Sequence, residues 1–256
     1  MILNPTGTHL YIDLRFPCQQ KGEKSPVVIF SHTFGGNGTD NRRMQRILIA
    51  GGIAVCSFDF RGGSGYKSGR SRGDMRSMSV FTQKDDLDVV IDLVQEQEGI
   101  DPDRIYLLGA SQGGFVSALV ASNRPQDIRG LFLVYPAMCI PEEARQRYSS
   151  LEEVPDEIEL MGLKIGKTYY QYLLDYNFQE EIRKYKGKVF IFHGDQDEIA
   201  DISYSKQAVK MYDNAKLYVM RGEGHGFSKK VQRMLSRFII NEILGPRKRL
   251  EESSSN

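Results

Sequence analysis

The segment RIYLLGASQGGFVSALVAS, residues 104–122, decides the fold of this chain. RIYLL is an apolar run of the kind that forms a strand buried on both faces of a parallel sheet. FVSALVAS has the composition of a buried helix, and GASQG between them matches Gly-x-Ser-x-Gly. A strand, a sharp turn and a helix in succession force Ser111 into a strained turn with its hydroxyl exposed. Gly109 and Gly113 are needed beside it because a Cβ there would collide with a neighbouring element.

Similar apolar runs recur along the chain and predict a layered α/β fold. The other predicted buried strands are 26–31, 53–59, 130–135, 188–193 and 215–220, and 8–16 alternates as an edge strand facing water would. The apolar spacing i, i+3, i+4, i+7 predicts helices over 83–98 and 228–243. This alternation predicts an open, mostly parallel sheet with helices on both faces.

The alternation of strands and helices breaks once, between Pro136 and Lys186. This stretch is charged and rich in tyrosine, and a segment of that length inside a compact domain is not expected to be bare loop. We interpret 136–186 as a small inserted cap over the sheet edge. The core of the fold is then 1–135 and 187–246, and 247–256 is expected to be a flexible tail.

The composition is that of an ordinary globular chain. Its 256 residues include 34 Lys and Arg against 33 Asp and Glu, and 40% are hydrophobic, which excludes disordered, collagen-like and membrane-bundle classes. The net charge of +1 gives no basic face for nucleic acid, and Arg247-Lys248-Arg249 is followed after one leucine by two acids. Neither a signal peptide nor a membrane-spanning run is visible, and no association with a membrane is expected. Three scattered cysteines match no metal or redox spacing, so we expect a reduced, cytoplasmic protein.

A serine hydroxyl becomes a good nucleophile only when a base takes its proton, and that base is usually histidine. Of the four histidines, His225 in GEGHGF lies after the last apolar run and before the last predicted helix. His32 and His193 each end a predicted strand, where packing or a loop hydrogen bond is the expected role. His9 lies in the edge strand, far from Ser111. His225 is therefore the predicted base.

The base in turn needs a carboxylate that sets its tautomer and stabilises the imidazolium. The segment GDQDEIADI, 194–202, supplies four acids. Asp195 follows the strand almost at once and is expected to shape the turn, whereas Asp197 is far enough along the loop to reach the next one. No metal site is predicted here because no second His or Cys group offers the remaining ligands.

The placements of these residues agree with one another. Ser111, Asp197 and His225 each follow the carboxyl end of a different predicted strand, where open α/β sheets hold their sites. They also occur in the order Ser, Asp, His. The loop HTFGG, 32–36, ends a fourth strand and can bring a backbone N–H to the same place. The oxyanion donors are then predicted to be the N–H groups of Phe34 and Gln112.

These residues carry a resemblance to known proteins over nearly the whole chain. The sequence resembles an α/β-hydrolase, and DFRGGSGYKSG, 59–69, is similar to a stretch common in that superfamily. More narrowly, the feruloyl (cinnamoyl) esterases of bacteria share segments similar to GASQGG, HTFGGN, LVYPA, HGDQD and GEGHGF in this order. The resemblance implies the same triad and oxyanion donors, hydrolysis of hydroxycinnamic esters, no metal and no cofactor.

The resemblance also implies a role for the cap. In that family an acidic residue early in the cap and a later tyrosine bind the hydroxyls of the phenolic ring, and Glu143 and Tyr169 fall nearest those positions. Two features depart from the family. Its oxyanion loop usually begins His-Gly, where this chain has His32-Thr33, and its cap acid is often Asp.

The sequence therefore predicts a serine carboxylic-ester hydrolase that acts through an acyl-enzyme on small hydroxycinnamate esters. The alternatives are a general short-chain esterase, an acylglycerol lipase and a peptidase on the same fold. A hydrolase-like fold kept as a binding or scaffold protein is a further alternative from a different class. The oligomeric state is open, with a homodimer as one option.

Overall fold

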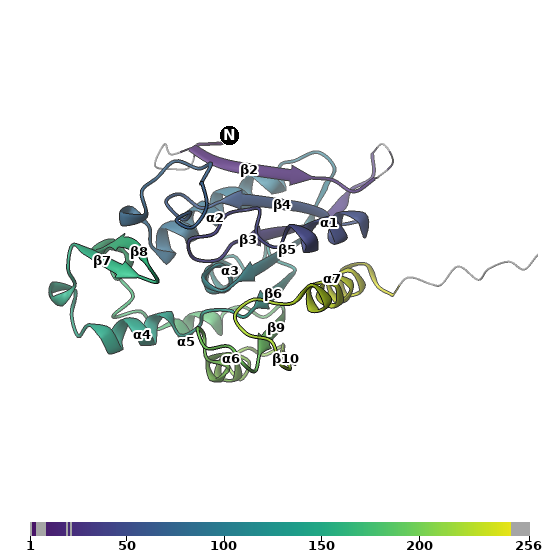
Figure 1. The fold of residues 1–256 in the computed structure, drawn as a ribbon. Helices are drawn as coiled ribbons and strands as arrows, with labels where there is room; N and C mark the ends of the chain where they lie inside the picture. Colours follow the sequence, from purple (N-terminus) through teal and green to yellow (C-terminus); the bar gives the residue numbers. More distant parts are fainter. Residues whose placement is uncertain (1, 4–8, 19, 21, 247–256) are drawn as a thin grey trace, which may run out of the picture.

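The computed structural model describes residues 2–3, 9–18, 20 and 22–246, and its centre is one twisted, mostly parallel sheet (Figure 1). The strand order is β1-β2-β4-β3-β5-β6-β9-β10. Its strands are β1 (Ile2–Leu3), β2 (His9–Arg15), β3 (Ser25–Ser31), β4 (Ala54–Asp59), β5 (Ile100–Ala110), β6 (Gly130–Val134), β9 (Lys188–Gly194) and β10 (Ala215–Met220). From β4 to β10 all neighbours pair in parallel. All six predicted runs are confirmed as strands, but β10 is not buried on both faces as predicted, because it lies at the edge of the sheet and its residues are partly or fully exposed.

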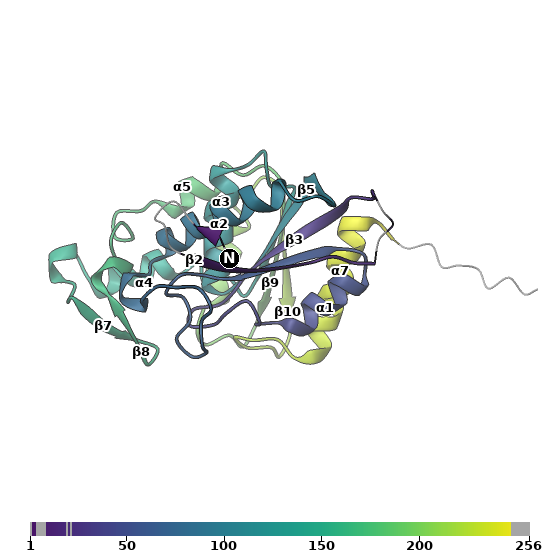
Figure 2. The same ribbon diagram turned by 90° about the horizontal axis from the view of Figure 1, so that it is seen from above.

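Helices cover both faces of this sheet, as predicted. On one face α1 (Arg42–Ala50) packs against α7 (Lys229–Leu244), and on the other lie α2 (Val80–Gln95) and α3 (Gln112–Asn123) (Figure 2). The predicted helices over 83–98 and 228–243 correspond to α2 and α7. The hydroxyl of Ser228 accepts the N–H of Val231 and caps α7. A further helix, α6 (Ile202–Ala208), follows β9.

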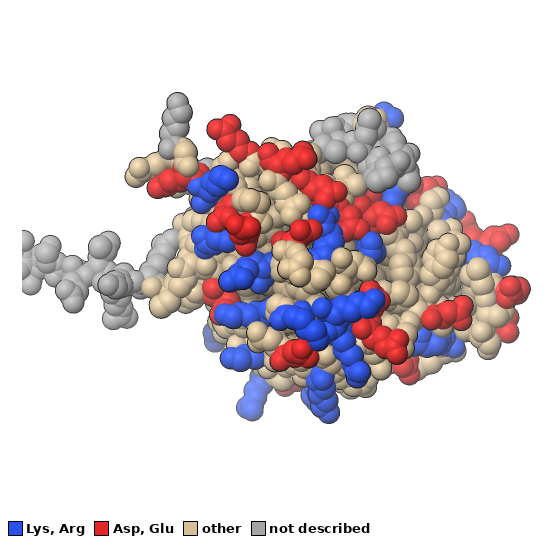
Figure 3. All heavy atoms as spheres, turned by 180° about the vertical axis from the view of Figure 1, so that it is seen from behind, with Lys and Arg blue, Asp and Glu red and all other residues tan. Residues whose placement is uncertain are grey.

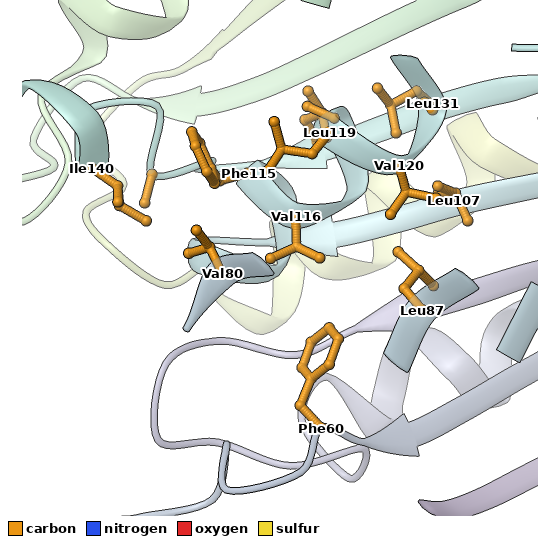
Figure 4. Packing of buried hydrophobic residues seen from close by; sticks show 14 of the residues in the cluster. Phe60, Val80, Leu87, Leu107, Phe115, Val116, Leu119, Val120, Leu131 and Ile140 are labelled. Atoms are coloured by element: carbon orange, nitrogen blue, oxygen red, sulfur yellow. The ribbon is translucent and has the colours of Figure 1, made fainter. Parts of the chain in front are cut away.

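The helix α3 is the most deeply buried helix of the fold. It lies between β5 and α2, and Val116 and Val120 point from it into the core beside Leu107 (Figure 4). Because α3 is covered on all sides, its sequence is apolar around its whole circumference rather than on one stripe. The helix that follows Ser111 is therefore held within the core.

Ion pairs join α2 to the end of α3 on the outer surface. Acidic and basic side chains lie near one another on the face shown in Figure 3. Arg124, directly after α3, pairs with Asp92 of α2 at 2.6 Å and with Asp127 at 2.6 Å. Pairs of this partly exposed kind add little to stability individually, but these fix how two helices meet.

The edge of the sheet differs from the prediction. The segment 8–16 was expected to be an edge strand, but β2 pairs with β4 on one side and with the two-residue β1 on the other. An edge assignment rested on alternation alone, and alternation cannot show that two further residues pair outside the strand. The predicted tail, 247–256, lies outside the described residues.

The segment between β6 and β9 folds into short elements rather than bare loop. They are α4 (Ile140–Arg147), a 3-10 turn (Leu151–Glu153), β7 (Glu157–Leu160), β8 (Leu163–Gly166), a second 3-10 turn (Lys167–Tyr169) and α5 (Phe178–Ile182). The strands β7 and β8 form an antiparallel hairpin whose turn residues Met161 and Gly162 have φ of 50° and 74°. No strand was predicted here, because β7 and β8 are too short and too polar to form an apolar run.

Among the residues that the structure describes, none belongs to a helix long and apolar enough to span a membrane.

Candidate active site

Ser111 sits in the sharp turn between β5 and α3. Its φ and ψ of 53° and −122° are rare for a residue with a side chain, which confirms the predicted strained turn, but Ser111 is buried at 7% exposure rather than exposed as predicted. The structure also shows why glycines flank it. A Cβ on Gly109 would lie 2.3 Å from the carbonyl oxygen of Gly113, and a Cβ on Gly113 would lie 2.4 Å from those of Ser31 and His32.

Gly113→Ala should therefore destabilise the protein. The added methyl meets two backbone oxygens that cannot move without shifting β3, and overpacking of this kind costs roughly 1–3 kcal/mol. We expect the melting temperature to fall by several degrees in a thermal unfolding experiment. Gly224→Ala is the control, since its Cβ would meet only the carbonyl oxygen of Gln196 at 3.3 Å. Equal melting temperatures for the Gly113→Ala variant and the wild type would contradict this account of the turn.

Three side chains from different loops meet in one hydrogen-bonded chain. Nε2 of His225 lies 2.8 Å from Oγ of Ser111, and Nδ1 of His225 lies 2.8 Å from Oδ2 of Asp197. When Nδ1–H donates to Asp197, Nε2 is left free to accept the hydroxyl of Ser111. The structure thus brings together the three residues predicted as the triad, although Ser111 and His225 are 114 positions apart in the sequence.

The carboxylate of Asp197 is fully buried and well supplied with donors. Oδ1 accepts the backbone N–H groups of Ile199 at 3.0 Å and Ala200 at 2.9 Å. Burial alone would raise its pKa, but hydrogen bonds from His193 and His225 and the Ala200 N–H together hold that pKa well below the ordinary value. The carboxylate therefore stabilises the fold above the ordinary Asp pKa of ~3.9, and this stabilisation is lost as the pH falls through its lower folded value.

The other candidates have different surroundings. His32 lies beside the carbonyl oxygen of Thr33 at 2.8 Å and accepts the N–H of Phe60 at 3.0 Å, and burial lowers its pKa. Asp195 is exposed and accepts the N–H of Gly222 at 2.7 Å, as expected of a residue that shapes a turn. From the sequence, His193 was expected only to pack or to bond a loop. In the structure its Nε2 lies 3.2 Å from Oδ2 of Asp197.

The two backbone N–H groups predicted as oxyanion donors are available for a further acceptor. Among hydrogen bonds between described residues, the N–H groups of Phe34 and Gln112 have no acceptor. The unusual Thr33 donates its hydroxyl to Asp40 at 3.2 Å, on the far side of a turn closed by Gly36 N–H and the Thr33 carbonyl. Thr33 therefore anchors the loop through its side chain.

The two predicted cap residues lie on one cavity of about 340 Å³, but they differ in exposure. Glu143 is exposed on α4, whereas Tyr169 is buried. The Tyr169 hydroxyl donates to Oε1 of Gln112 at 2.7 Å, and its ring meets that of Phe34 edge-on at 6.3 Å. Nε2 of Gln112 donates to the buried Gln83 at 2.9 Å. Tyr169 is thus hydrogen-bonded to Gln112, the residue after Ser111, a contact that no local sequence signal could reveal.

No group of three or more His, Cys, Asp and Glu side chains in the described part of the chain is arranged to hold a metal ion.

Comparison with known proteins places this chain in a family. A family profile described as serine aminopeptidase, S33, a family of α/β-hydrolases, matches residues 22–174, more than half of the chain. The chain belongs to this family. The matched range of the S33 family includes Ser111 but ends before Asp197 and His225.

Among solved structures, Est1E from Butyrivibrio proteoclasticus with bound ferulic acid aligns with a TM-score of 0.84 and 27% identity. The alignment covers 96% of this S33-family chain and 100% of that one. A monoacylglycerol lipase from Paleococcus ferrophilus aligns with a TM-score of 0.68 and 17% identity, over 92% of this chain and 98% of that one, which shows the shared fold. The structure thus has the α/β-hydrolase fold and is similar to that of Est1E over nearly its whole length.

Curated relatives match over shorter ranges. Human monoglyceride lipase is 24% identical over 167 residues, which are 64% of this chain and 52% of that protein. A 31.7 kDa protein of Escherichia coli is 32% identical over 126 residues, 46% of this chain and 39% of that protein. This member of the S33 family therefore spans about half or less of the curated relatives that it matches.

Proposed function

We propose that this chain is a serine carboxylic-ester hydrolase that acts through an acyl-enzyme on esters of hydroxycinnamic acids. The observation that carries the proposal is the hydrogen-bonded chain from Ser111 through His225 to the buried Asp197. The resemblance to a structure holding ferulic acid supports the acyl class. The family and the fold alone would not separate esters from other acyl substrates.

The first half of the reaction forms the acyl-enzyme. His225 takes the proton of Ser111 as Oγ attacks the ester carbonyl, and Asp197 stabilises the imidazolium that results. The carbonyl oxygen becomes an oxyanion beside the free N–H groups of Phe34 and Gln112, which donate to it without rearrangement. His225 then delivers the proton to the departing alcohol, and the C–O bond of the ester breaks.

The second half uses the same groups on water. His225 accepts a proton from water as the water oxygen attacks the acyl carbon, and the N–H groups of Phe34 and Gln112 again hold the oxyanion. When the oxyanion collapses, Ser111 leaves with the proton that His225 returns. The free acid is released, and the triad is restored.

We propose further that the insertion 136–186 is the cap that selects the acyl group. Tyr169 lines the cavity beside α4, and its hydroxyl donates a hydrogen bond to Gln112. The Tyr169 oxygen donates to Gln112 but can still accept a hydrogen bond from a phenol. Glu143 offers an acceptor on the same cavity. A hydroxylated ring placed there would find both partners.

Glu143→Ala should lower kcat/KM for methyl caffeate and methyl ferulate by roughly 5- to 150-fold, the equivalent of ~1–3 kcal/mol for a ring hydroxyl left without its partner. Turnover of p-nitrophenyl acetate should hardly change, since an acetyl group cannot reach α4. Glu142→Ala is the control, because Glu142 is the adjacent exposed acid and lines a different cavity. Equal losses on all esters would show an effect on the fold rather than on the acyl group.

Tyr169→Phe should behave differently from Glu143→Ala. It removes the donor to Gln112 as well as a partner for the ring. We therefore expect kcat for both cinnamate esters and p-nitrophenyl acetate to fall, with the larger loss on the cinnamates. A loss confined to cinnamates in steady-state kinetics would show that the bond to Gln112 contributes nothing to positioning.

A glyceride lipase is the second candidate, favoured by the match to human monoglyceride lipase. A panel of methyl ferulate, methyl caffeate, tributyrin and a long-chain glyceride separates the two. The proposal predicts the highest kcat/KM on the hydroxycinnamates, and a preference for either glyceride would overturn the acyl class. Absence of turnover on every ester, p-nitrophenyl acetate included, would instead indicate a binding protein on a hydrolase fold.

A further inference from the structure

A second histidine, His193, contacts the carboxylate of the proposed triad. Its Nε2 lies 3.2 Å from Oδ2 of Asp197 and 2.8 Å from the carbonyl oxygen of Ala200. Its Nδ1 lies 2.7 Å from Oγ of Ser205. The side chains of His193 and Asp197 are both fully buried. Asp197 is therefore shared between two imidazoles, those of His193 and His225.

The surroundings of His193 define which nitrogen carries its proton. The carbonyl of Ala200 and the ionised carboxylate of Asp197 can only accept hydrogen bonds, so Nε2 must carry a hydrogen. The hydroxyl of Ser205 can donate to Nδ1. A neutral ring protonated at Nε2 thus satisfies every partner, and no second charge needs to be buried beside the triad.

The backbone of Ala200 links His193 to Asp197 indirectly, in addition to their direct contact. The N–H of Ala200 donates to Oδ1 of Asp197 at 2.9 Å, while its carbonyl faces Nε2 of His193 at 2.8 Å. The loop from Asp197 to Ala200 is therefore closed around the carboxylate and fastened to β9 through the imidazole. His193 acts on the loop as well as on the carboxylate itself.

Few other titratable groups bear on this pair. Asp201 caps α6, and hydrogen bonds from Ser203 lower its pKa. On the side of His225, the ring of Tyr135 lies 4.9 Å away, and burial raises the pKa of its hydroxyl. Burial raises the pKa of the Cys139 thiol, and the charges of Glu143 and Asp197 act in the same direction.

We propose that His193 is a positioning residue of the triad, whose Nε2–H holds the Asp197 carboxylate and its loop so that the carboxylate faces Nδ1 of His225. This inference rests on the proposed function, because it assigns His193 a role only if His225 is the base. It predicts that turnover depends on a donor at the Nε2 position of His193 and does not depend on Nδ1.

Two amide variants separate the nitrogens. The amide nitrogen of glutamine falls near the Nε2 position of an imidazole, and that of asparagine falls near Nδ1. His193→Gln should keep kcat for p-nitrophenyl acetate within about threefold of the wild type. His193→Asn should lower kcat roughly 10- to 100-fold, the scale of one lost hydrogen bond to a buried charge, with KM nearly unchanged.

The pH profile gives a readout that mere packing would not move. Without the Nε2–H donor, the negative charge of Asp197 is compensated less, which favours the protonated form of His225. The acid limb of kcat/KM should therefore move to higher pH in His193→Asn and stay in place in His193→Gln. Val94→Ala, in the buried face of α2, is the control for lost stability and should leave the limb in place.

Equal losses in both amide variants, or no loss in either, would overturn the proposal. If His193→Asn fails to fold, nitrogen-15 NMR of the wild-type histidines decides the question, since a ring of His193 protonated at Nδ1 or at both nitrogens would contradict it. Ser111→Ala is measured in the same series. If it retains turnover, the proposed function fails; if it is inactive and the His193 variants do not differ, only this inference fails.

Discussion

Replacing Ser111 by alanine is expected to lower kcat for p-nitrophenyl acetate by about four to six orders of magnitude. Without Oγ no acyl-enzyme can form, and only the oxyanion donors and binding remain. The fold should survive, because Ser111 contributes no more than a hydroxyl to the packing of a turn that the glycines on either side permit. Removing the hydroxyl leaves the backbone conformation of the turn unchanged.

The experiment needs protein free of contaminating esterase, so the variant is purified beside a mock preparation. Circular dichroism and a melting curve report whether the variant is folded. A well-folded Ser111→Ala protein that keeps a tenth of the wild-type turnover would exclude Ser111 as the nucleophile.

Asp197→Asn is expected to lower kcat by about 10⁴-fold, since an amide can donate to Nδ1 and leave His225 in the wrong tautomer. The matched control is Asp195→Asn, two residues earlier in the same loop. Asp195 accepts the N–H of Gly222 at 2.7 Å, which an asparagine oxygen can also do, so we expect a loss of less than about tenfold.

Steady-state kinetics of the two folded variants decides between the two acids. If the Asp195 variant is the more damaged, the carboxylate of the triad has been assigned to the wrong residue.

The sequence predicted the elements that are buried and regular. The strands β3, β4, β5, β6 and β9 were predicted because a strand covered on both faces must be apolar throughout, and β10 was predicted by a similar apolar run although it lies half-exposed at the sheet edge. It did not predict α1, whose N-cap residue Asn41 has a left-handed φ of 52° and makes no side-chain cap hydrogen bond. Nor did it predict the β7–β8 hairpin, which is held by pairing rather than by an apolar pattern.

For the site, the sequence indicated which residue types follow which strands, and the order Ser, Asp, His then restricted the choice. Contacts between loops were beyond its reach. His193 was expected to bond a loop, but that its Nε2 would also face Asp197 depends on how residues 197–200 fold back. The bond from Tyr169 to Gln112 joins two residues 57 positions apart and depends on where the inserted segment comes to rest.

The most direct test of an acyl-transfer mechanism at Ser111 is covalent labelling with an organophosphate that mimics the tetrahedral intermediate. The protein is treated with diethyl p-nitrophenyl phosphate, and the adduct is located by peptide mass spectrometry while residual ester turnover is followed. The account predicts one phosphoryl group per chain, on Ser111, formed in step with the loss of turnover and absent from the Ser111→Ala variant. Complete labelling of Ser111 with turnover retained, or inactivation with the label on another residue, would contradict it.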